Sequence, residues 1–284
     1  MNILSFDVED WQQGFIHRGI NGWEKFESRE GKNIDLILKL LDEYDTKATF
    51  FVLGKFAKKN PWIVKQIYLA GHEIASHSYS HIEISKLTPN EFKLDVRKSK
   101  ELLSDIIGEK IIGYRAPRWS INSKCFWALD ILAENGYKYD SSIFPSNIHP
   151  FGNSKYIYTP HLIELTNGGS IIEFPGQILN VFGFNLPIGG GFYFRAAPIS
   201  LTQYALKRSK ERNNYSMVYL HPFEFDKQVP RLKVGFSFRI IRYYKLDKTE
   251  PYLRRILHTM KFSSCKTYLE SNINSFPLKN FSVS

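Results

Sequence analysis

The feature that most constrains the fold is a regular alternation of short apolar runs and helical patterns in the first half of the chain. Apolar runs occupy residues 3–6, 48–52, 72–76 and 111–114, and a segment with helical periodicity follows each of them. This order is typical of parallel strands joined by helical crossovers. We therefore expect an α/β fold in which the strand carboxyl ends gather on one face, the face that carries the active site in barrels of this kind.

Local signals place several boundaries within this pattern. In the run Thr88-Pro89-Asn90-Glu91, Thr88 can cap a helix, Pro89 suits its first turn and Glu91 completes a capping box, so we expect a helix that runs toward Gly108. Residues 144–194 are rich in Gly, Pro, Asn and aromatic residues, which predicts an insertion of loops and short strands over the open face. Regular pattern resumes with an expected helix over 197–208, a strand over 217–220 and a last helix over about 251–260.

Domain organisation follows from the same pattern. The chain has 284 residues and shows neither an internal repeat nor a low-complexity linker. We expect a single catalytic domain over 1–284, with a core of about 1–260 and a C-terminal tail over 265–284. The sequence does not indicate the oligomeric state.

The charge of the chain bears on its partners. There are 38 basic and 28 acidic residues, a net charge of +10, and basic residues interleave with aromatic ones over 231–255. Such a segment could face anionic lipid, substrate phosphate or nucleic acid, or form a solvated basic surface. Because no nucleic-acid motif accompanies it, we expect no nucleic-acid partner and keep peripheral contact with an anionic membrane as an alternative.

Composition also limits location and redox chemistry. Two cysteines, Cys125 and Cys265, are too few for a disulfide framework or a thiolate zinc site. No window reaches the length of a membrane span, and residues 1–7 lack the charged and apolar regions of a secretion signal. We expect a cytoplasmic protein, with the inner face of the membrane as a further location.

Two histidines four residues apart, His77 and His81, follow the third apolar run, and carboxylates at Asp7, Glu9 and Asp10 follow the first. Two imidazoles and one carboxylate on a divalent ion leave coordination positions open, which is the ligand count of a hydrolytic zinc site. The alternative is a polar loop with two solvated imidazoles. The common position of both segments at strand ends favours the metal site.

The ordered motifs resemble the polysaccharide deacetylase superfamily, also called carbohydrate esterase family four. They are the segments 6–10, 77–81, 114–119 and 220–222. Segments 139–142, 173–175 and 221–226 resemble the branch associated with bacterial exopolysaccharide and surface-glycan synthesis. The resemblance covers about residues 1–260 and implies a distorted, TIM-like (β/α) barrel of about seven strands.

The resemblance implies hydrolytic removal of N-acetyl groups from a glycan that contains N-acetylhexosamine, or from its lipid-linked precursor. Asp7 corresponds to the catalytic base, Arg115 to the arginine that orients it, and His221 to the general acid. The chemistry agrees, because amide hydrolysis needs an activated water and a protonated leaving nitrogen. Taken singly, Asp7 could instead cap a turn and His221 could be a hydrogen-bonded core histidine.

The resemblance also assigns the metal ligands. His77 and His81 correspond to the metal histidines, and a nearby carboxylate supplies the third protein ligand. The family usually has two adjacent aspartates, whereas Val8, Glu9 and Asp10 follow Asp7 here. We favour Asp10 and keep Glu9 as the alternative. Zinc is the expected metal, and Co²⁺, Ni²⁺ or Mn²⁺ could replace it.

Substrate contacts are predicted at Trp119, Tyr193 and Arg195. Trp119 follows the arginine motif after an intervening Arg118, where the family usually has an aromatic residue directly after the proline. Tyr193 and Arg195 follow the glycine run at 189–191, which we interpret as turns. Two other functions remain open: hydrolysis of another C–N bond, formyl or cyclic amide, and non-catalytic glycan binding on the same fold.

Overall fold

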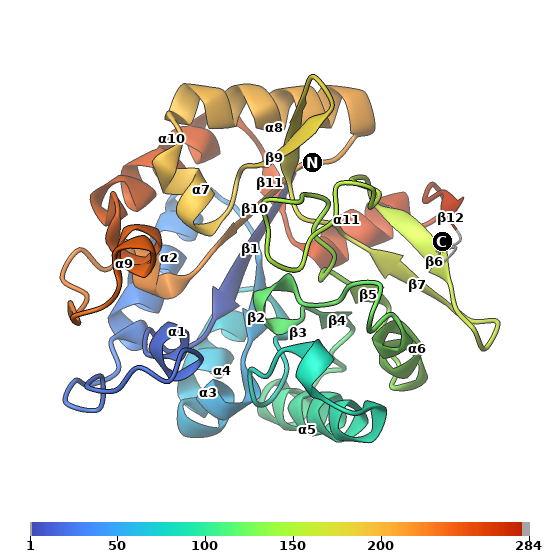
Figure 1. The fold of residues 1–284 in the computed structure, drawn as a ribbon, viewed down its shortest axis with the longest axis horizontal. Helices are drawn as coiled ribbons and strands as arrows, with labels where there is room; N and C mark the ends of the chain where they lie inside the picture. The colour runs from blue at the N-terminus through green and yellow to red at the C-terminus, as the bar shows by residue number, and fades with distance from the viewer. Residues whose placement is uncertain (1, 280–284) are drawn as a thin grey trace.

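A ten-stranded sheet organises the chain, which the computed structural model describes over residues 2–279 (Figure 1). Seven neighbouring strands pair in parallel, in the order β10 (Met217–Leu220), β1 (Asn2–Val8), β2 (Thr49–Val52), β3 (Glu73–Ser76), β4 (Gly113–Tyr114), β5 (Tyr139–Asp140) and β7 (Ser170–Glu173). Beyond them, β6 (His161–Glu164) pairs antiparallel with β7, β12 (Leu278–Lys279) pairs with β6, and β11 (Phe262–Ser263) pairs with β1. The expected α/β fold with parallel strands is confirmed. The strand ladder ends at β10 and β12, so pairing among the described residues does not close it into the expected barrel.

Helices cover the outside of this sheet (Figure 1). They are α1 (Gln13–Ile16), α2 (Glu30–Glu43), α3 (Gly54–Lys59), α4 (Pro61–Leu69), α5 (Pro89–Ile107), α6 (Trp127–Glu134), α7 (Gly191–Ala196), α8 (Ile199–Asn213), α9 (Phe236–Tyr243), α10 (Thr249–Thr259) and α11 (Cys265–Asn272). In Figure 1, α8 lies at the top of the view, and α3, α4 and α5 lie at the bottom.

The helix boundaries follow local chemistry. The Thr88 side chain accepts from the Glu91 amide, and the Glu91 carboxylate accepts from the Thr88 amide, so the predicted capping box is present at the start of α5. The same helix ends at Gly108, whose φ of 78° suits glycine. Two helices, α3 and α4, follow β2 in place of one continuous helix, because Asn60 leaves helical geometry and Pro61 starts α4.

Strand β1 shows how the sheet divides its two faces. Leu4, Phe6 and Val8 belong to the core between the sheet and the helices, with residues of α2 and α4. Ser5 and Asp7 alternate with them and point to the opposite face. Asp7 pairs in register with Phe51 of β2, whose side chain belongs to a second core inside the curved sheet. The inner face of β1 therefore carries the polar residues toward the strand carboxyl ends.

The segment 144–194 contains the expected loops and short strands, but only part of it is an insertion. Strands β6 and β7 extend the main sheet, while β8 (Ile178–Val181) and β9 (Phe184–Pro187) form a separate hairpin. The described part of the segment expected as a C-terminal tail from residue 265 is structured and packed. Cys265 is fully buried at the start of α11, and β12 joins the sheet, while residues 280–284 lie outside the described part. No described helix is both long and apolar enough to span a bilayer.

Candidate active site

An open cavity of about 230 Å³ lies at the carboxyl ends of the parallel strands. Its wall is lined by residues at the ends of four strands: the ends of β1, β3 and β10 with the loops that follow them, and the segment after β4. Residues in this wall include Asp7, Glu9, His77, His81, Trp119 and His221. The sequence-based expectation that these segments meet on one face is confirmed by their positions. Parallel pairing is the reason, because it brings every carboxyl end to the same edge.

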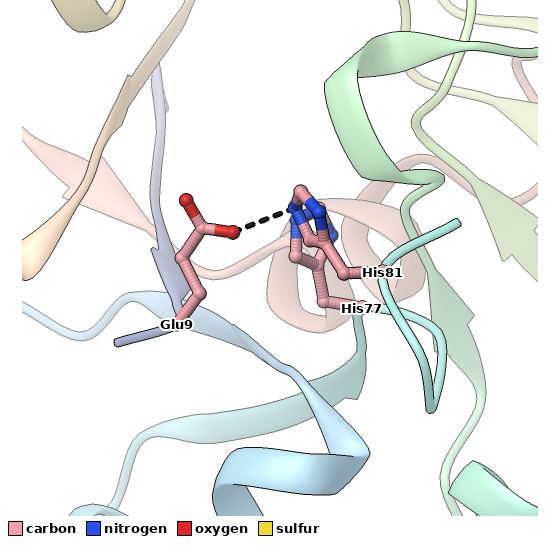
Figure 2. A group of neighbouring side chains, drawn as sticks. All are labelled: Glu9, His77 and His81. Atoms are coloured by element: carbon pink, nitrogen blue, oxygen red, sulfur yellow. Dashed lines mark ion pairs between the residues drawn. The ribbon is translucent and has the colours of Figure 1, made fainter. Parts of the chain in front are cut away.

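Three side chains in this wall form a cluster suited to a divalent metal. One ligand atom each from Glu9, His77 and His81 lies within 4.8 Å of the others, and all three residues are buried. Figure 2 shows the Glu9 carboxylate extending from the end of β1 toward the two imidazoles. Oε2 of Glu9 lies 2.6 Å from Nε2 of His81, yet this oxygen has no hydrogen-bond partner by geometry. A buried, unsatisfied carboxylate oxygen facing two imidazoles fits a cation site.

The protonation of the cluster also suits metal binding. His77 Nδ1 donates to the Arg115 carbonyl at 2.9 Å, which leaves the Nε2 lone pair free. Burial lowers the pKa of His77 to about 4, so its imidazole is neutral at pH 7. Burial would raise the pKa of Glu9, but the charge of His81 outweighs it and the pKa falls to about 2. Neutral imidazole and ionised carboxylate are the forms that bind metal.

The placement of Asp10 differs from our preference for it as the third carboxylate. Asp10 lies outside the metal-compatible group and lines a different hollow, with Lys55 and Phe56. Strand β1 ends at Val8, so the path of the chain beyond the strand sets these directions. It turns Glu9 toward the histidines and Asp10 toward the hollow lined by Lys55 and Phe56.

Asp7 lies beneath the cluster in a buried ion pair. Its Oδ1 accepts from Arg115 Nη1 at 2.7 Å, and both side chains are almost completely inaccessible to solvent. Burial would raise the pKa of Asp7, but the charges of Arg115, His77 and His221 outweigh it and lower the pKa. Asp7 therefore stays ionised, with Oδ1 held by arginine and Oδ2 lying 3.9 Å from His221 Nε2.

Arg115 is held in place on every side. Its guanidinium also donates to Ser5 Oγ at 3.0 Å and to Ser141 Oγ at 2.9 Å. The Phe51 ring lies 4.0 Å from the guanidinium carbon and the Trp119 ring 4.4 Å. Such a fixed, desolvated arginine orients the carboxylate that it binds.

Trp119 contributes more to this packing than to an open face for sugar. Its ring is 3% exposed and lies 5.4 Å from the Phe144 ring and 5.1 Å from the Tyr219 ring. Trp119 and the preceding Arg118 both adopt left-handed backbone angles, with φ of 54° and 58°. The indole lies against the Arg115 guanidinium. Trp119 lines the cavity, but its ring faces are largely covered by protein.

His221 enters the cavity from the end of β10. Its Nδ1 donates to Glu224 Oε1 at 2.8 Å, so Nε2 is the nitrogen directed toward Asp7. Burial would lower the pKa of His221, but the hydrogen bond and charge of Glu224 outweigh it and raise the pKa. The histidine is therefore poised to be a proton donor near neutral pH.

Arg195 extends this chain of interactions and does not face the cavity as a free cation. Its Nε donates to Glu224 Oε2 at 2.7 Å, and its two other nitrogens donate to the carbonyls of Tyr244 and Ile241 at 2.8 Å. Arg195 lines the cavity, but its guanidinium holds Glu224, and the substrate contact expected for it stays a prediction. Tyr193, half-buried in α7, does line the cavity.

Glu224 is the residue that sequence reasoning missed. It is the third residue of the 3₁₀ helix η3 (Pro222–Phe225), and its carboxylate accepts from the amide of His221 at 3.0 Å. The pattern His221-Pro222-Phe223-Glu224 has the spacing of the capping box that we identified at Thr88. That signal could have assigned Glu224 as the partner of His221.

The basic segment 231–255 is not one solvated surface. Arg242 of α9 is 5% exposed, donates to the Trp11 carbonyl and lies 3.5 Å from the Phe223 ring centre. It lines the cavity that holds the cluster. Arg254 forms ion pairs with Glu43 and Glu250 on the outside of the molecule. The segment therefore divides its charge between the cavity wall and the surface.

Comparison with known proteins shows which families the two halves of the chain match. A profile of the family described as polysaccharide deacetylase matches residues 24–139, and a profile of a domain of unknown function, DUF3473, matches residues 141–270. A peptidoglycan deacetylase of Helicobacter pylori is 32% identical over 118 residues, which are 42% of this chain and 39% of that protein. A peptidoglycan-N-acetylglucosamine deacetylase of Bacillus cereus is 38% identical over 82 residues, which are 28% of this chain and 30% of that protein.

The matched regions thus span well under half of these relatives. A solved structure agrees over a longer range: a candidate polysaccharide deacetylase from Mycobacterium smegmatis superposes with a TM-score of 0.70, at 20% identity, over 100% of this chain and 93% of the other. At that identity the superposition establishes the fold. The profile and the two relatives confirm the resemblance drawn from the motifs: residues 24–139 match the polysaccharide deacetylase family, and the whole chain shares the fold of the Mycobacterium smegmatis protein.

Proposed function

We propose that this chain is a metal-dependent N-deacetylase that acts on a glycan containing N-acetylhexosamine or on its lipid-linked precursor. The observation that carries the proposal is that the buried group Glu9, His77 and His81 lines the same cavity as Asp7 and His221. Asp7 pairs with Arg115 and lies 3.9 Å from His221. The superfamily and the deacetylase relatives support the same reaction class.

We assign the metal to Glu9, His77 and His81. A divalent ion bound there would lower the pKa of a water molecule and polarise the acetamide carbonyl. The donor set of two imidazoles and one carboxylate suits zinc, and cobalt, nickel and manganese accept the same ligands. Glu9 replaces Asp10 in this assignment, because Asp10 points to another part of the surface.

The chain's own residues supply the proton transfers. Asp7 accepts a proton at Oδ2 from the attacking water, while Arg115 holds Oδ1 and keeps the carboxylate in orientation. His221 Nε2 donates a proton to the departing amine nitrogen. Glu224, itself held by Arg195, fixes the tautomer of His221 through Nδ1. The product is a free amine on the sugar and acetate.

The test pairs metal content with product release. Purified protein is loaded with zinc, and Glu9→Gln and Asp10→Asn are compared as variants with the same loss of charge. We expect Glu9→Gln to lose bound metal and acetate release from acetylated chitooligosaccharides or lipid-linked N-acetylhexosamines, and Asp10→Asn to retain both. If Asp10→Asn loses the metal and Glu9→Gln keeps it, the ligand assignment fails.

The two alternative functions give different outcomes in the same assay. Release of formate in place of acetate would favour hydrolysis of another C–N bond. Retained sugar binding without turnover, unchanged by Asp7→Asn, would favour a non-catalytic glycan-binding protein. Cytoplasmic location and contact with an anionic membrane remain predictions, which fractionation of cells and vesicle binding would test.

A further inference from the structure

Two arginines in the cavity wall lack an acidic partner. The cavity is lined by Arg18, Arg118, Arg195 and Arg242, and Arg115 lies beneath it. Arg115 pairs with Asp7, Arg118 with Glu83 and Arg195 with Glu224. In the part of the chain that the structure describes, no carboxylate lies within 4.0 Å of the guanidinium of Arg18 or Arg242.

Arg242 is the stronger of the two observations, because it is 5% exposed. A buried cation is normally paired, since desolvation without a counter-charge is costly. Arg242 donates to the Trp11 carbonyl and packs on the Phe223 ring, but its buried Nε has no hydrogen-bond partner. Burial lowers the pKa of Arg242 to about 10, so it is still a cation at neutral pH.

Glu9 and Glu30, the two acids whose charges act on Arg242, do not form ion pairs with it in the described part of the chain. Glu9 is engaged with the two histidines, with its Oε2 2.6 Å from His81 Nε2. Glu30 accepts from the Trp11 amide at 2.9 Å and is fully buried at the start of α2. The positive charge of Arg242 is therefore available to the cavity.

Arg18 and Arg242 lie on either side of Gly14 and Phe238. Nη1 of Arg18 donates to the Gly14 carbonyl at 3.2 Å, and the guanidinium carbon of Arg18 lies 4.1 Å from the centre of the Phe238 ring. A Cβ built on Gly14 would lie 3.5 Å from Arg242 Nη1 and 3.8 Å from the same Phe238 ring. Gly14 and Phe238 thus separate two arginines that have no acidic partner, at the side of the cavity formed by α1 and α9.

We propose, on the basis of the function proposed above, that Arg18 and Arg242 form a subsite for a negatively charged substituent of the amino-sugar substrate, a carboxylate or a phosphate. Both chemistries match the planar donor array of arginine. A membrane surface is a poorer fit, because Arg242 is buried inside the cavity that contains Glu9, His77 and His81. The subsite would select acidic glycans or sugar phosphates over neutral chitin-like chains.

The experiment compares three small ligands that share an N-acetylglucosamine ring. They are the neutral methyl glycoside, N-acetylglucosamine 1-phosphate and N-acetylmuramic acid, which carries a carboxylate. Dissociation constants are measured by calorimetry with metal-free and with zinc-loaded protein, at low and high salt. The variants are Arg18→Met and Arg242→Lys, and the matched control is Arg239→Met, an exposed arginine of the same helix α9 that does not line the cavity.

We expect at least one charged sugar to bind about tenfold or more tightly than the methyl glycoside, with a preference that weakens at high salt. Arg18→Met should lose most of this preference and leave the affinity for the neutral sugar unchanged, while Arg239→Met should behave as wild type. Because Arg242 is buried, Arg242→Lys is used after circular dichroism shows that it folds; it keeps the charge but loses the planar fork, so the preference should fall.

Each outcome decides the proposal. Tighter binding of the phosphate alone assigns the subsite to phosphate, and tighter binding of the acid alone assigns it to carboxylate. Equal affinity for all three sugars, or equal losses in Arg18→Met and Arg239→Met, would overturn the subsite. A charge preference without acetate release under any metal would reject the proposed deacetylation and keep the subsite. Acetate release without a charge preference would reject the subsite and keep the proposed deacetylation.

Discussion

The buried pair of Arg115 and Asp7 offers the sharpest test of how this site is held together. Arg115 is 0% exposed and Asp7 2%, and their shortest N–O distance is 2.7 Å. Arg115→Met keeps much of the side-chain volume but leaves the Asp7 carboxylate buried without its main counter-charge. Breaking a buried ion pair from one side costs about 3–5 kcal/mol of stability. We expect a loss of that size in the free energy of unfolding.

Whether a second substitution stabilises or destabilises Arg115→Met tests whether the uncompensated Asp7 charge causes the loss. When Asp7→Asn is added to Arg115→Met, the uncompensated charge is removed, so the double variant should be more stable than Arg115→Met by about 1 kcal/mol or more. Asp7→Asn alone breaks the same pair from the other side and leaves the buried Arg115 charge with neutral acceptors such as Ser5 and Ser141, so it should also cost about 3–5 kcal/mol. The two single losses should therefore sum to more than the loss in the double variant.

Urea unfolding of the metal-free protein, followed by tryptophan fluorescence, measures these differences through the transition midpoint and slope. Arg254→Met is the matched control, because Arg254 pairs with Glu43 and Glu250 at the surface and should cost at most about 1 kcal/mol. The reasoning fails if Arg115→Met costs no more than Arg254→Met. It also fails if adding Asp7→Asn destabilises Arg115→Met further.

Three other predictions follow from the remaining buried charges. His221→Ala should lower kcat by about 10²- to 10⁴-fold with little change in bound metal, because a general acid is lost; equal kcat in both proteins would exclude that role. Glu224→Gln should lower the pKa of His221 and move the basic limb of the kcat/KM profile to lower pH, so an unmoved limb would count against Glu224. Burial raises the pKa of Glu30 from 4.5 to about 8, so the folded protein binds more protons than the unfolded one between those values. Its stability should therefore fall as pH rises, by up to about 1.4 kcal/mol per unit from this group, and unfolding of Glu30→Gln should lack that part of the slope.

Much of the architecture could be predicted because it depends on neighbours in sequence. The capping box at Thr88 and the apolar runs of β1, β2 and β3 act over a few residues, and each was identified from the sequence. Parallel pairing then brings together segments that are far apart in the sequence. It brings the residues after separate strands to one edge, which is why Asp7, His77 and His221 meet as expected.

The sequence could not decide those features that depend on the direction of a side chain or on a distant contact. The sequence favoured Asp10 and kept Glu9 as the alternative, whereas the path of the chain at the end of β1 turns Glu9 toward His77 and His81. Arg195 follows a glycine run that suggested a substrate contact, but Glu224, 29 residues later, takes its guanidinium.

The contrast has one physical reason. Strand and helix propensities, caps and turns are set by atoms within a few residues, so the sequence by itself determined the α/β fold and most of the segments that form the site. Other features depend on contacts between distant segments. Arg242 is buried against Trp11, 231 residues away, residues 265–272 pack as α11, and Glu9 faces the two histidines in place of Asp10. Only the tertiary structure decides such contacts, because the desolvation that selects them exists only once the chain is packed.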